Sequence, residues 1–174
     1  MRGSQKALPS ANAARCRPRS FCNIATIVAP PPIPNIRPAR PSDEADIVAL
    51  DHAALASAKR RAFLARAVRD GECHVLVVDA RAVAYVCVDD RFFGNGWVSL
   101  LYVAPAHRRR GYGEALLRHA ERLCREPKLF TSTNAPNTPM HALLHKLGYV
   151  RSGTIDNLDE GDPEWVFVKR MKGE

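Results

Sequence analysis

Three consecutive arginines and two closely spaced glycines lie between an apolar stretch and an amphipathic one. The segment reads LYVAPAHRRRGYGEALLRHAERL, residues 101–123, and contains Arg108, Gly111 and Gly113 in the arrangement R-x-x-G-x-G. The first backbone N–H groups of a helix have no partner within it, and the helix dipole adds partial positive charge there. Glycine lets an anion approach these groups, and arginine supplies charge around it. The pattern predicts a diphosphate-binding turn at the start of a helix.

Other interpretations of this segment stay open. Glycine also permits close packing between a helix and a strand, and arginines often form a solvated surface. A Rossmann dinucleotide turn is a poorer match, because it expects G-x-G-x-x-G and only Gly111 and Gly113 are present. The residues alone therefore indicate an anion site without settling the ligand.

A second segment, NTPMHALLHKLGYVRSG at residues 137–153, combines an asparagine, an amphipathic helix pattern and a glycine before an aromatic residue. Together with the first segment, and in this order, it resembles the GCN5-related N-acetyltransferase (GNAT) family over about residues 33–172. The resemblance implies an α/β (α+β mixed) GNAT fold. Such a fold has a central, twisted, mostly antiparallel mixed sheet of about six to seven strands, flanked by about four helices.

The resemblance also implies an activity. Acetyl-CoA is expected as the acyl-donor cosubstrate, with direct transfer of the acetyl group to a primary amine, expected to belong to a small molecule. No metal is expected. Acetylation of a protein lysine or N-terminus is an alternative, and so is a non-catalytic sensor that binds acyl-CoA. Dimers are frequent among relatives, which leaves a homodimer open.

Several residues take a cofactor-binding role if the family pattern holds. Backbone N–H groups of the turn would hold the diphosphate, and the main chain of the preceding strand would pair with the pantetheine arm, as an added strand does. Asn137 matches the asparagine at the start of the following helix, although asparagine also serves as an ordinary cap. The residues implied are Leu101, Tyr102, Val103, Arg108, Arg109, Arg110, Gly111, Tyr112, Gly113 and Asn137.

Catalytic residues are harder to assign. Many family members have a tyrosine four residues before the helix-ending glycine, where this chain has Leu144 within an apolar stripe. Either the thiolate leaves unaided or another group protonates it, for which Tyr102 is the first substitute and core packing or exposure is its alternative role. Asn134 is a second amide able to hold the donor, or else an ordinary turn residue. Behind them stand other polar side chains, for each of which core packing or exposure is the alternative: Ser99, His74, His141 and His145.

Acidic residues are concentrated near the C-terminus, in the segment DNLDEGDPE. The sequence predicts a loop there, in the region where relatives build part of the acceptor pocket. These acids would attract a cationic amine, or else form a solvated turn: Asp156, Asp159, Glu160, Asp162 and Glu164.

The elements that position these residues follow from hydrophobic periodicity and turn signals. In the first half we expect a short strand at 33–39, a helix capped by Ser42 and continuing to Leu55, a helix at 57–69, a hairpin of 73–79 with 81–90, and a strand at 97–103. In the second half we expect a helix at 111–125, a strand at 128–133, a helix capped by Thr138, and strands at 149–155 and 164–170.

The net charge of +8 is unevenly placed. Residues 1–41 hold seven basic and no acidic residues, which leaves 19 basic and 18 acidic residues in the rest of the chain. A nearly neutral domain argues against a nucleic-acid partner. Residues 1–34 contain several prolines and show neither helical nor alternating hydrophobic periodicity, which predicts a disordered, basic, Pro-rich extension. An N-acetyltransferase domain is expected to follow at 35–174.

The five cysteines form no C-x-x-C pair, and their odd number leaves at least one unpaired. A reducing, cytoplasmic location is the simplest interpretation. No apolar run approaches the roughly 20 residues that a membrane span requires, so no membrane partner is expected.

Overall fold

The computed structural model describes residues 35–171, which form seven strands, five α-helices and two 3-10 helices. The predicted extension at 1–34 lies outside the described residues. In chain order the elements are β1 (Asn35–Pro38), η1 (Pro41–Asp43), α1 (Glu44–Leu50), α2 (His52–Ala56), α3 (Ala58–Arg69), β2 (Cys73–Val78), β3 (Arg81–Phe92), β4 (Asn95–Val103), η2 (Pro105–His107), α4 (Tyr112–Leu123), β5 (Lys128–Asn134), α5 (Thr138–Lys146), β6 (Val150–Asp159) and β7 (Asp162–Arg170).

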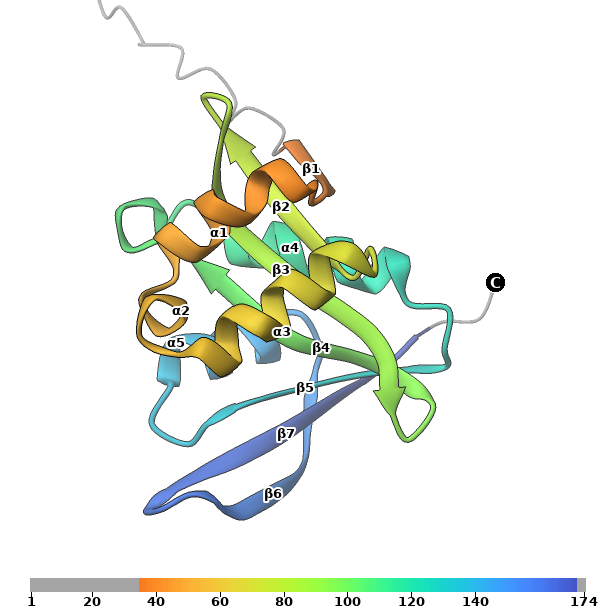
Figure 1. Cartoon of the computed structure of the whole chain (residues 1–174). Helices are drawn as coiled ribbons and strands as arrows, with labels where there is room; N and C mark the ends of the chain where they lie inside the picture. Colours follow the sequence, from red (N-terminus) through yellow and green to blue (C-terminus); the bar gives the residue numbers. More distant parts are fainter. Residues whose placement is uncertain (1–34, 172–174) are drawn as a thin grey trace, which may run out of the picture. The chain divides into compact units, whose positions relative to one another are not determined.

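The strands form one mixed sheet in the order β1-β2-β3-β4-β5-β7-β6 (Figure 1). Every neighbouring pair is antiparallel except β4 and β5, which are parallel. The expected mixed, mostly antiparallel sheet of six to seven strands is therefore confirmed. A parallel pair needs a crossover, and the α4 segment supplies it between β4 and β5.

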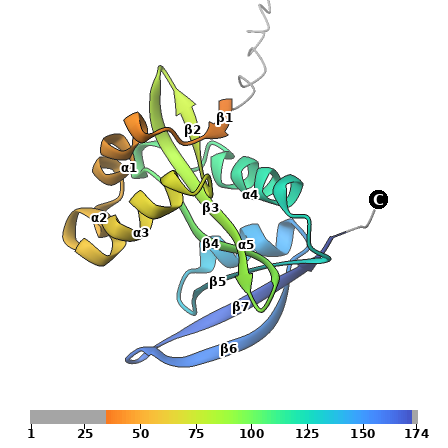
Figure 2. The same cartoon turned by 45° about the vertical axis from the view of Figure 1, so that its right-hand side comes forward.

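Helices cover both faces of the sheet. Figure 2 shows α1 and α3 on one side of the sheet and α4 on the other. Two clusters of buried hydrophobic side chains hold the helices against the sheet. One joins α1, α2 and α3 to β2 and β3, and the other joins α4 and α5 to the central strands and β7. Alternation along β4 assigns its side chains to the two clusters in turn: Leu100 and Tyr102 pack toward α1–α3, while Leu101 and Val103 pack toward α4.

The helix predicted from Ser42 to Leu55 is wrong in two respects. Its start is a 3-10 turn, in which the Asp43 carboxylate, not the Ser42 hydroxyl, accepts the capping bond, 2.7 Å from the Arg40 backbone N. The helix is also interrupted at Asp51, whose extended backbone separates α1 from α2 and whose side chain accepts from Ala53 N at 2.9 Å. A carboxylate that caps a new helix competes with continuation of the old one, which accounts for five helices instead of about four.

The hairpin predicted between β2 and β3 is confirmed, with Asp79 and Ala80 both at positive φ in its two-residue turn. The acidic loop predicted at the C-terminus is wrong. Most of it extends β6 and β7, and the turn is reduced to Glu160 and Gly161. The strand predicted at 149–155 therefore continues to Asp159, and because every residue of this edge strand is exposed, the added residues show no apolar alternation by which they could be recognised.

Two histidines join α4 to β2 beneath the helix. Arg122 Nη2 lies 3.5 Å from His119 Nδ1, and His119 Nε2 lies 3.0 Å from His74 Nδ1. Because a guanidinium only donates, His119 Nδ1 accepts, and the proton on Nε2 is then donated to His74. Burial, with the adjacent His119, lowers the pKa of His74 to about 4. Both rings are therefore neutral at pH 7.

We expect the stability of the fold to decline as the pH falls below 6.5. The folded-state pKa of His74 lies below its unfolded value of 6.5, so the contribution is complete above that pH and is lost as the pH falls toward 4. Between pH 7.5 and 5.0 the loss of unfolding free energy should be about 2 kcal/mol, because one pKa unit corresponds to about 1.4 kcal/mol. Urea unfolding at both pH values measures it. In His74→Gln the loss should shrink by that amount, and an unchanged pH dependence would contradict the assignment.

Candidate functional site

The parallel pair β4–β5 is short and then separates. Pairing covers Gly96–Val98 with Leu129–Thr131, and the Thr131 hydroxyl donates to the Val98 carbonyl at 3.1 Å where it ends. Beyond that point β5 continues to pair with β7, while the β4 residues 99–103 keep only β3 as a neighbour. The two strands diverge in Figure 1. One edge of β4 thus offers unpaired backbone groups to an extended ligand.

The turn after β4 presents backbone N–H groups at the start of α4. Gly111 is the N-terminal cap in the left-handed conformation (φ 80°), without a side-chain capping bond, and Arg109 is also left-handed (φ 62°). Among the hydrogen bonds of residues 35–171, none uses the N–H groups of Arg109–Gly113. The positive end of α4 coincides with these free donors, so the turn is suited to a phosphate group.

The three arginines of the turn are exposed but not equivalent. Arg108 Nε donates to the carbonyl of Val103 at 3.1 Å, which turns its side chain back toward β4. Arg109 and Arg110 take part in none of the hydrogen bonds or ion pairs found within 35–171. Two guanidinium groups therefore remain free to neutralise an anion bound at the backbone.

The packing interpretation of the glycines holds for Gly113. A Cβ atom there would lie 3.2 Å from Leu143 Cδ2 and close to Leu101 and Val103. A Cβ on Gly111 would meet nothing within 4 Å. Gly113 thus lets α4 approach β4 and α5, whereas Gly111 is required by its backbone conformation.

Tyr102 lies on the unpaired part of β4, on the side facing α1–α3. Its ring stacks on that of Tyr85, with centroids 5.9 Å apart and planes 18° apart. Tyr85 in turn donates its hydroxyl proton to the buried carboxylate of Asp51. The stack fixes the ring of Tyr102 on the part of β4 that has no β5 partner.

The two asparagines lie at the other side of the separation, at the end of β5 and the start of α5. Asn134 Nδ2 donates to Asp162 Oδ2 at 2.7 Å, which leaves its carbonyl oxygen free of protein partners in the described chain. Asn137 Oδ1 lies 3.4 Å from Met140 N, and its Nδ2 donates to Thr133 Oγ1 at 2.8 Å. Asn137 is therefore the cap of α5, and the prediction that Thr138 caps this helix is wrong.

The remaining candidates have structural partners. Ser99 Oγ lies 3.4 Å from the carbonyl of Cys87, and His74 is paired with His119. Leu144, where relatives have a tyrosine, is fully buried in the core beneath α5. The interpretation of Leu144 as a core residue is thus correct.

His141 and His145 lie on α5 facing β7. The ring of His141 stacks on Trp165, with centroids 4.6 Å apart and planes 7° apart. The ring of His145 meets Phe167 edge-on. Packing against β7 thus accounts for the position of both histidines.

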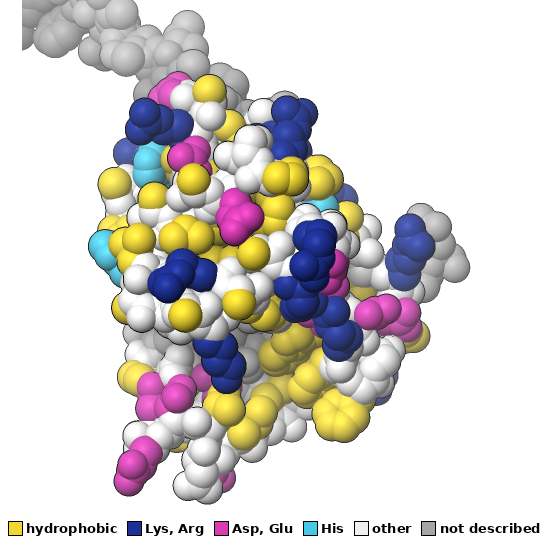
Figure 3. Space-filling model, viewed as in Figure 1, with side chains coloured by type: hydrophobic (Ala, Val, Ile, Leu, Met, Phe, Trp, Pro, Cys, Tyr) yellow, Lys and Arg dark blue, Asp and Glu magenta, His cyan; other side chains and the backbone are white. Residues whose placement is uncertain are grey.

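The C-terminal acids lie on the β6–β7 hairpin. Figure 3 shows acidic side chains gathered at the lower left, over the tip of this hairpin. Asp162 is bound to Asn134, and none of the five acids lines the cavity described next.

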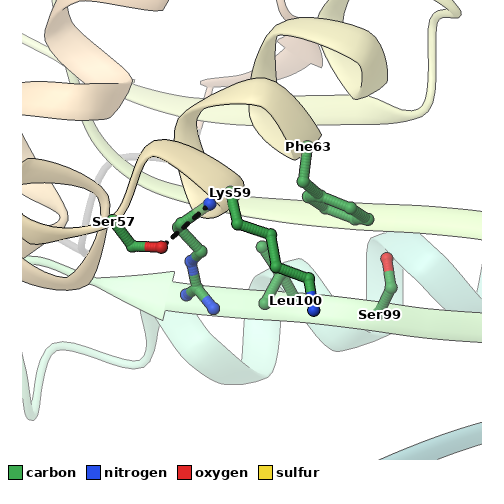
Figure 4. Close-up of a pocket in the computed structure, with 6 residues that line it drawn as sticks. Ser57, Lys59, Phe63, Ser99 and Leu100 are labelled. Carbon is green, nitrogen blue, oxygen red and sulfur yellow. Dashed lines mark hydrogen bonds between the residues drawn. The ribbon is translucent and has the colours of Figure 1, made fainter.

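A cavity of about 350 Å³ lies between the start of α3 and β4 (Figure 4). Its β4 side begins one residue after the pairing with β5 ends, at a bulge where β3 skips one residue of β4, so that two consecutive side chains face it. In Figure 4, Lys59 extends from α3 toward β4, which carries Ser99 and Leu100, and Phe63 points from α3 toward the sheet. The lining residues are Ser57, Lys59, Arg60, Phe63, Ser99 and Leu100.

The buried carboxylate of Asp51 holds one of the lining residues, Arg60, in place. Asp51 has no exposed surface, and besides the Tyr85 hydroxyl it accepts from Arg60 Nε at 3.0 Å and from Ala53 N at 2.9 Å. Burial alone would raise the pKa of Asp51, but the hydrogen bond from Tyr85 and the positive charge of Arg60 outweigh it and hold the pKa below its ordinary value. Asp51 is therefore ionised and fixes the guanidinium of Arg60.

This cavity is not among the features that the sequence predicts, although the apolar stripe correctly predicts the helix at 57–69. The available signal was the run Lys59, Arg60 and Arg61 in the first turn of that helix, where acidic residues are favoured and none is present. Asp51 carried no such signal, because its partners come from distant parts of the chain.

No group of three or more His, Cys, Asp or Glu side chains within 35–171 is arranged to hold a metal ion. Over the same range, no helix is long and apolar enough to cross a membrane.

Comparisons with known proteins agree on one family. A family model described as "Acetyltransferase (GNAT) family" matches residues 39–149. A solved acetyltransferase of the GNAT family from Bacillus cereus ATCC 10987 is 32% identical, with 80% of this chain and 98% of that chain covered and a TM-score of 0.74. None of the curated proteins compared with the chain matches it.

Two more distant structures share the fold. The structure of yncA from Salmonella typhimurium, solved with its cofactor acetyl-CoA, is 20% identical, covers 82% of this chain and 96% of its own, and has a TM-score of 0.65. The ribosomal-protein-S18-alanine N-acetyltransferase from Escherichia coli is 18% identical and has a TM-score of 0.65. The match covers 80% of this chain and 95% of that chain.

Proposed function

This chain belongs to the acetyltransferase (GNAT) family, and from that premise we propose that it transfers the acetyl group of acetyl-CoA to the primary amine of a small molecule. The observation that carries the proposal is the unpaired edge of β4, which ends beside a turn with free N–H groups. The unpaired edge of β4 suits an extended ligand arm, and the free N–H groups of the turn suit a diphosphate. Acetyl-CoA contains an extended pantetheine arm and a diphosphate.

The residues that would hold acetyl-CoA follow from this geometry. The N–H groups of Arg109–Gly113 would bind the diphosphate, with Arg109 and Arg110 adding charge. The main chain of Leu101–Val103 would pair with the pantetheine arm, and Gly113 keeps α4 close enough to β4 for both contacts. On the far side of the gap, the free carbonyl oxygen of Asn134 is an acceptor for an amide N–H of that arm.

Acetyl-CoA supplies a thioester carbonyl and a thiol leaving group. In the transfer a C–N amide bond forms and the C–S bond breaks, the amine nitrogen loses a proton and the thiolate gains one. Tyr102 is the proposed proton donor to the sulfur, because its ring is fixed by Tyr85 beside the gap. Water is the proposed acceptor of the amine proton.

The test is a thiol-release assay with acetyl-CoA and a panel of small primary amines. Wild-type chain should release CoA only when an amine is present. Tyr102→Phe should lower kcat about 100-fold, because positioned proton transfer contributes roughly 10²–10⁴ in rate, and it should leave the calorimetric Kd for acetyl-CoA unchanged. Tyr149→Phe is the matched control, since it removes a buried hydroxyl far from β4 in the sequence and should keep full activity.

Each other result contradicts a named part of the proposal. Binding of acetyl-CoA without turnover of any amine would favour a sensor. Turnover with peptides alone would favour a protein acetyltransferase. Equal kcat for Tyr102→Phe and wild type would remove Tyr102 from the mechanism.

A further inference from the structure

The cavity between α3 and β4 is positively charged. Two of its six lining residues are basic, none is acidic, and the others are two serines, Phe63 and Leu100. It opens on β4 immediately after the last residue paired with β5, which is where an acceptor must lie to reach a donor in the gap. Its charge therefore acts on the acceptor.

The two basic side chains are held differently. Arg60 uses Nε for the buried carboxylate of Asp51, and its two terminal amino groups make no hydrogen bond among residues 35–171. Lys59 is exposed and has no ion-pair partner among those residues. The charge of Arg60 is thus balanced by Asp51, but its terminal amino groups can still donate, and the Lys59 ammonium has no counter-ion within residues 35–171. A guanidinium fork held in place beside a mobile ammonium is a donor set that can bind a carboxylate.

The position of these charges opposes local stability. Lys59 and Arg60 lie in the first turn of α3, at the positive end of the helix dipole, where cations are disfavoured. Arg60 is compensated by its ion pair with Asp51, whereas Lys59 has no acidic partner within residues 35–171. A helix optimised only for folding would carry acids there. Departures from such local preferences are expected where a residue serves a ligand.

Resting on the proposed function, we propose that the acceptor is a small amine that also carries a carboxylate, held by Lys59 and Arg60. Phe63 and Leu100 contact the carbon chain between the two groups, and the amine points toward the gap between β4 and β5. At about 30 Å³ per water-sized group, the cavity admits an acceptor of about a dozen non-hydrogen atoms. An amino acid or a comparable molecule is of this size.

The same charges favour the chemistry. Pairing with Lys59 and Arg60 offsets the negative charge of the acceptor's own carboxylate, which would otherwise stabilise the ammonium form, and so lowers the pKa of the amine. The neutral amine is the form that attacks the thioester carbonyl. Lys59 and Arg60 therefore bind one end of the acceptor and promote loss of a proton at the other.

The experiment compares acceptors that differ only in charge. Amino acids with the amine at the α, β or γ position are paired with their primary amides and with the corresponding aminophosphonates. For the best pair, wild type should use the carboxylate with a kcat/KM about tenfold or more above that of the amide, since charge-assisted bonds are about twice as strong as neutral ones. In Lys59→Gln this ratio should fall about fivefold, and in Lys59→Glu the amide should be preferred.

Controls separate this inference from the proposed function. Arg69→Gln removes the same charge at the other end of α3 and should leave the ratio unchanged. All variants should bind acetyl-CoA with the wild-type Kd. Equal use of amide and carboxylate, or preference for the phosphonate, would overturn the inference and leave the acetyltransferase standing. Absence of turnover with every amine would overturn both.

Discussion

Replacing Gly111 with valine should weaken acetyl-CoA binding by at least about tenfold, because a β-branched residue at φ 80° is strained by roughly 1–3 kcal/mol and relief of the strain would redirect the N–H groups of the turn. Replacing a single arginine, as in Arg109→Gln, should weaken it only about two- to threefold, because exposed charges contribute little individually. Calorimetric titration with acetyl-CoA measures both.

Gly94→Val is the matched control for this experiment. Gly94 also has a positive φ (68°) and open space around it, but it lies in the β3–β4 turn, at the opposite end of β4 from Gly111. The same backbone strain there should leave the Kd for acetyl-CoA unchanged. A larger loss from Arg109→Gln than from Gly111→Val would mean that side chains, not main-chain donors, hold the diphosphate.

Asp51→Ala should reduce the free energy of unfolding by about 3–5 kcal/mol, as expected when one partner of a buried ion pair is removed. Three groups lose their acceptor at once: the guanidinium of Arg60, the hydroxyl of Tyr85 and the first free N–H of α2, from Ala53. Urea unfolding at pH 7 measures the loss. Asp51→Asn keeps one acceptor oxygen and should lose less.

Asp46→Ala provides the control for charge alone. Asp46 is an exposed acid on α1 whose side chain makes no hydrogen bond or ion pair within residues 35–171. Its removal should therefore change the free energy of unfolding by less than about 0.5 kcal/mol. If Asp51→Ala cost no more than this, the carboxylate would not be the support of the cavity that its contacts indicate.

Much of the fold was predictable because its elements carry strong local signals. The stripe of Leu116, Leu117 and Ala120 gave α4, and all three are buried in the structure. Two of the errors fall where a side chain acts against the surrounding pattern, as at Asp51, and where both faces of a strand are exposed, as at the end of β6. Neither case leaves a periodic trace in the sequence.

The candidate site, too, has one part that could be predicted from the sequence and one that could not. The turn proposed to bind the diphosphate is a continuous segment, so its glycines and arginines could be singled out from their spacing as an anion site. The cavity is built from α3 and β4, which are separated by two strands in the chain, and the register of β4 depends on a bulge. Spacing cannot reveal which side chains such a crossing brings together, and Lys59 and Arg60 were therefore overlooked.

In the sheet formed by residues 35–170, three paired residues on β4 and three on β5 join β1–β4 to β5–β7. A ligand bound in the gap between them would contact both parts of the sheet, in addition to any part it takes in a reaction. Such a ligand stabilises the native state by mass action, by about 2.7 kcal/mol when the ligand concentration is a hundred times its Kd. The lifetime of this protein in a cell would then follow the supply of the molecule that it consumes.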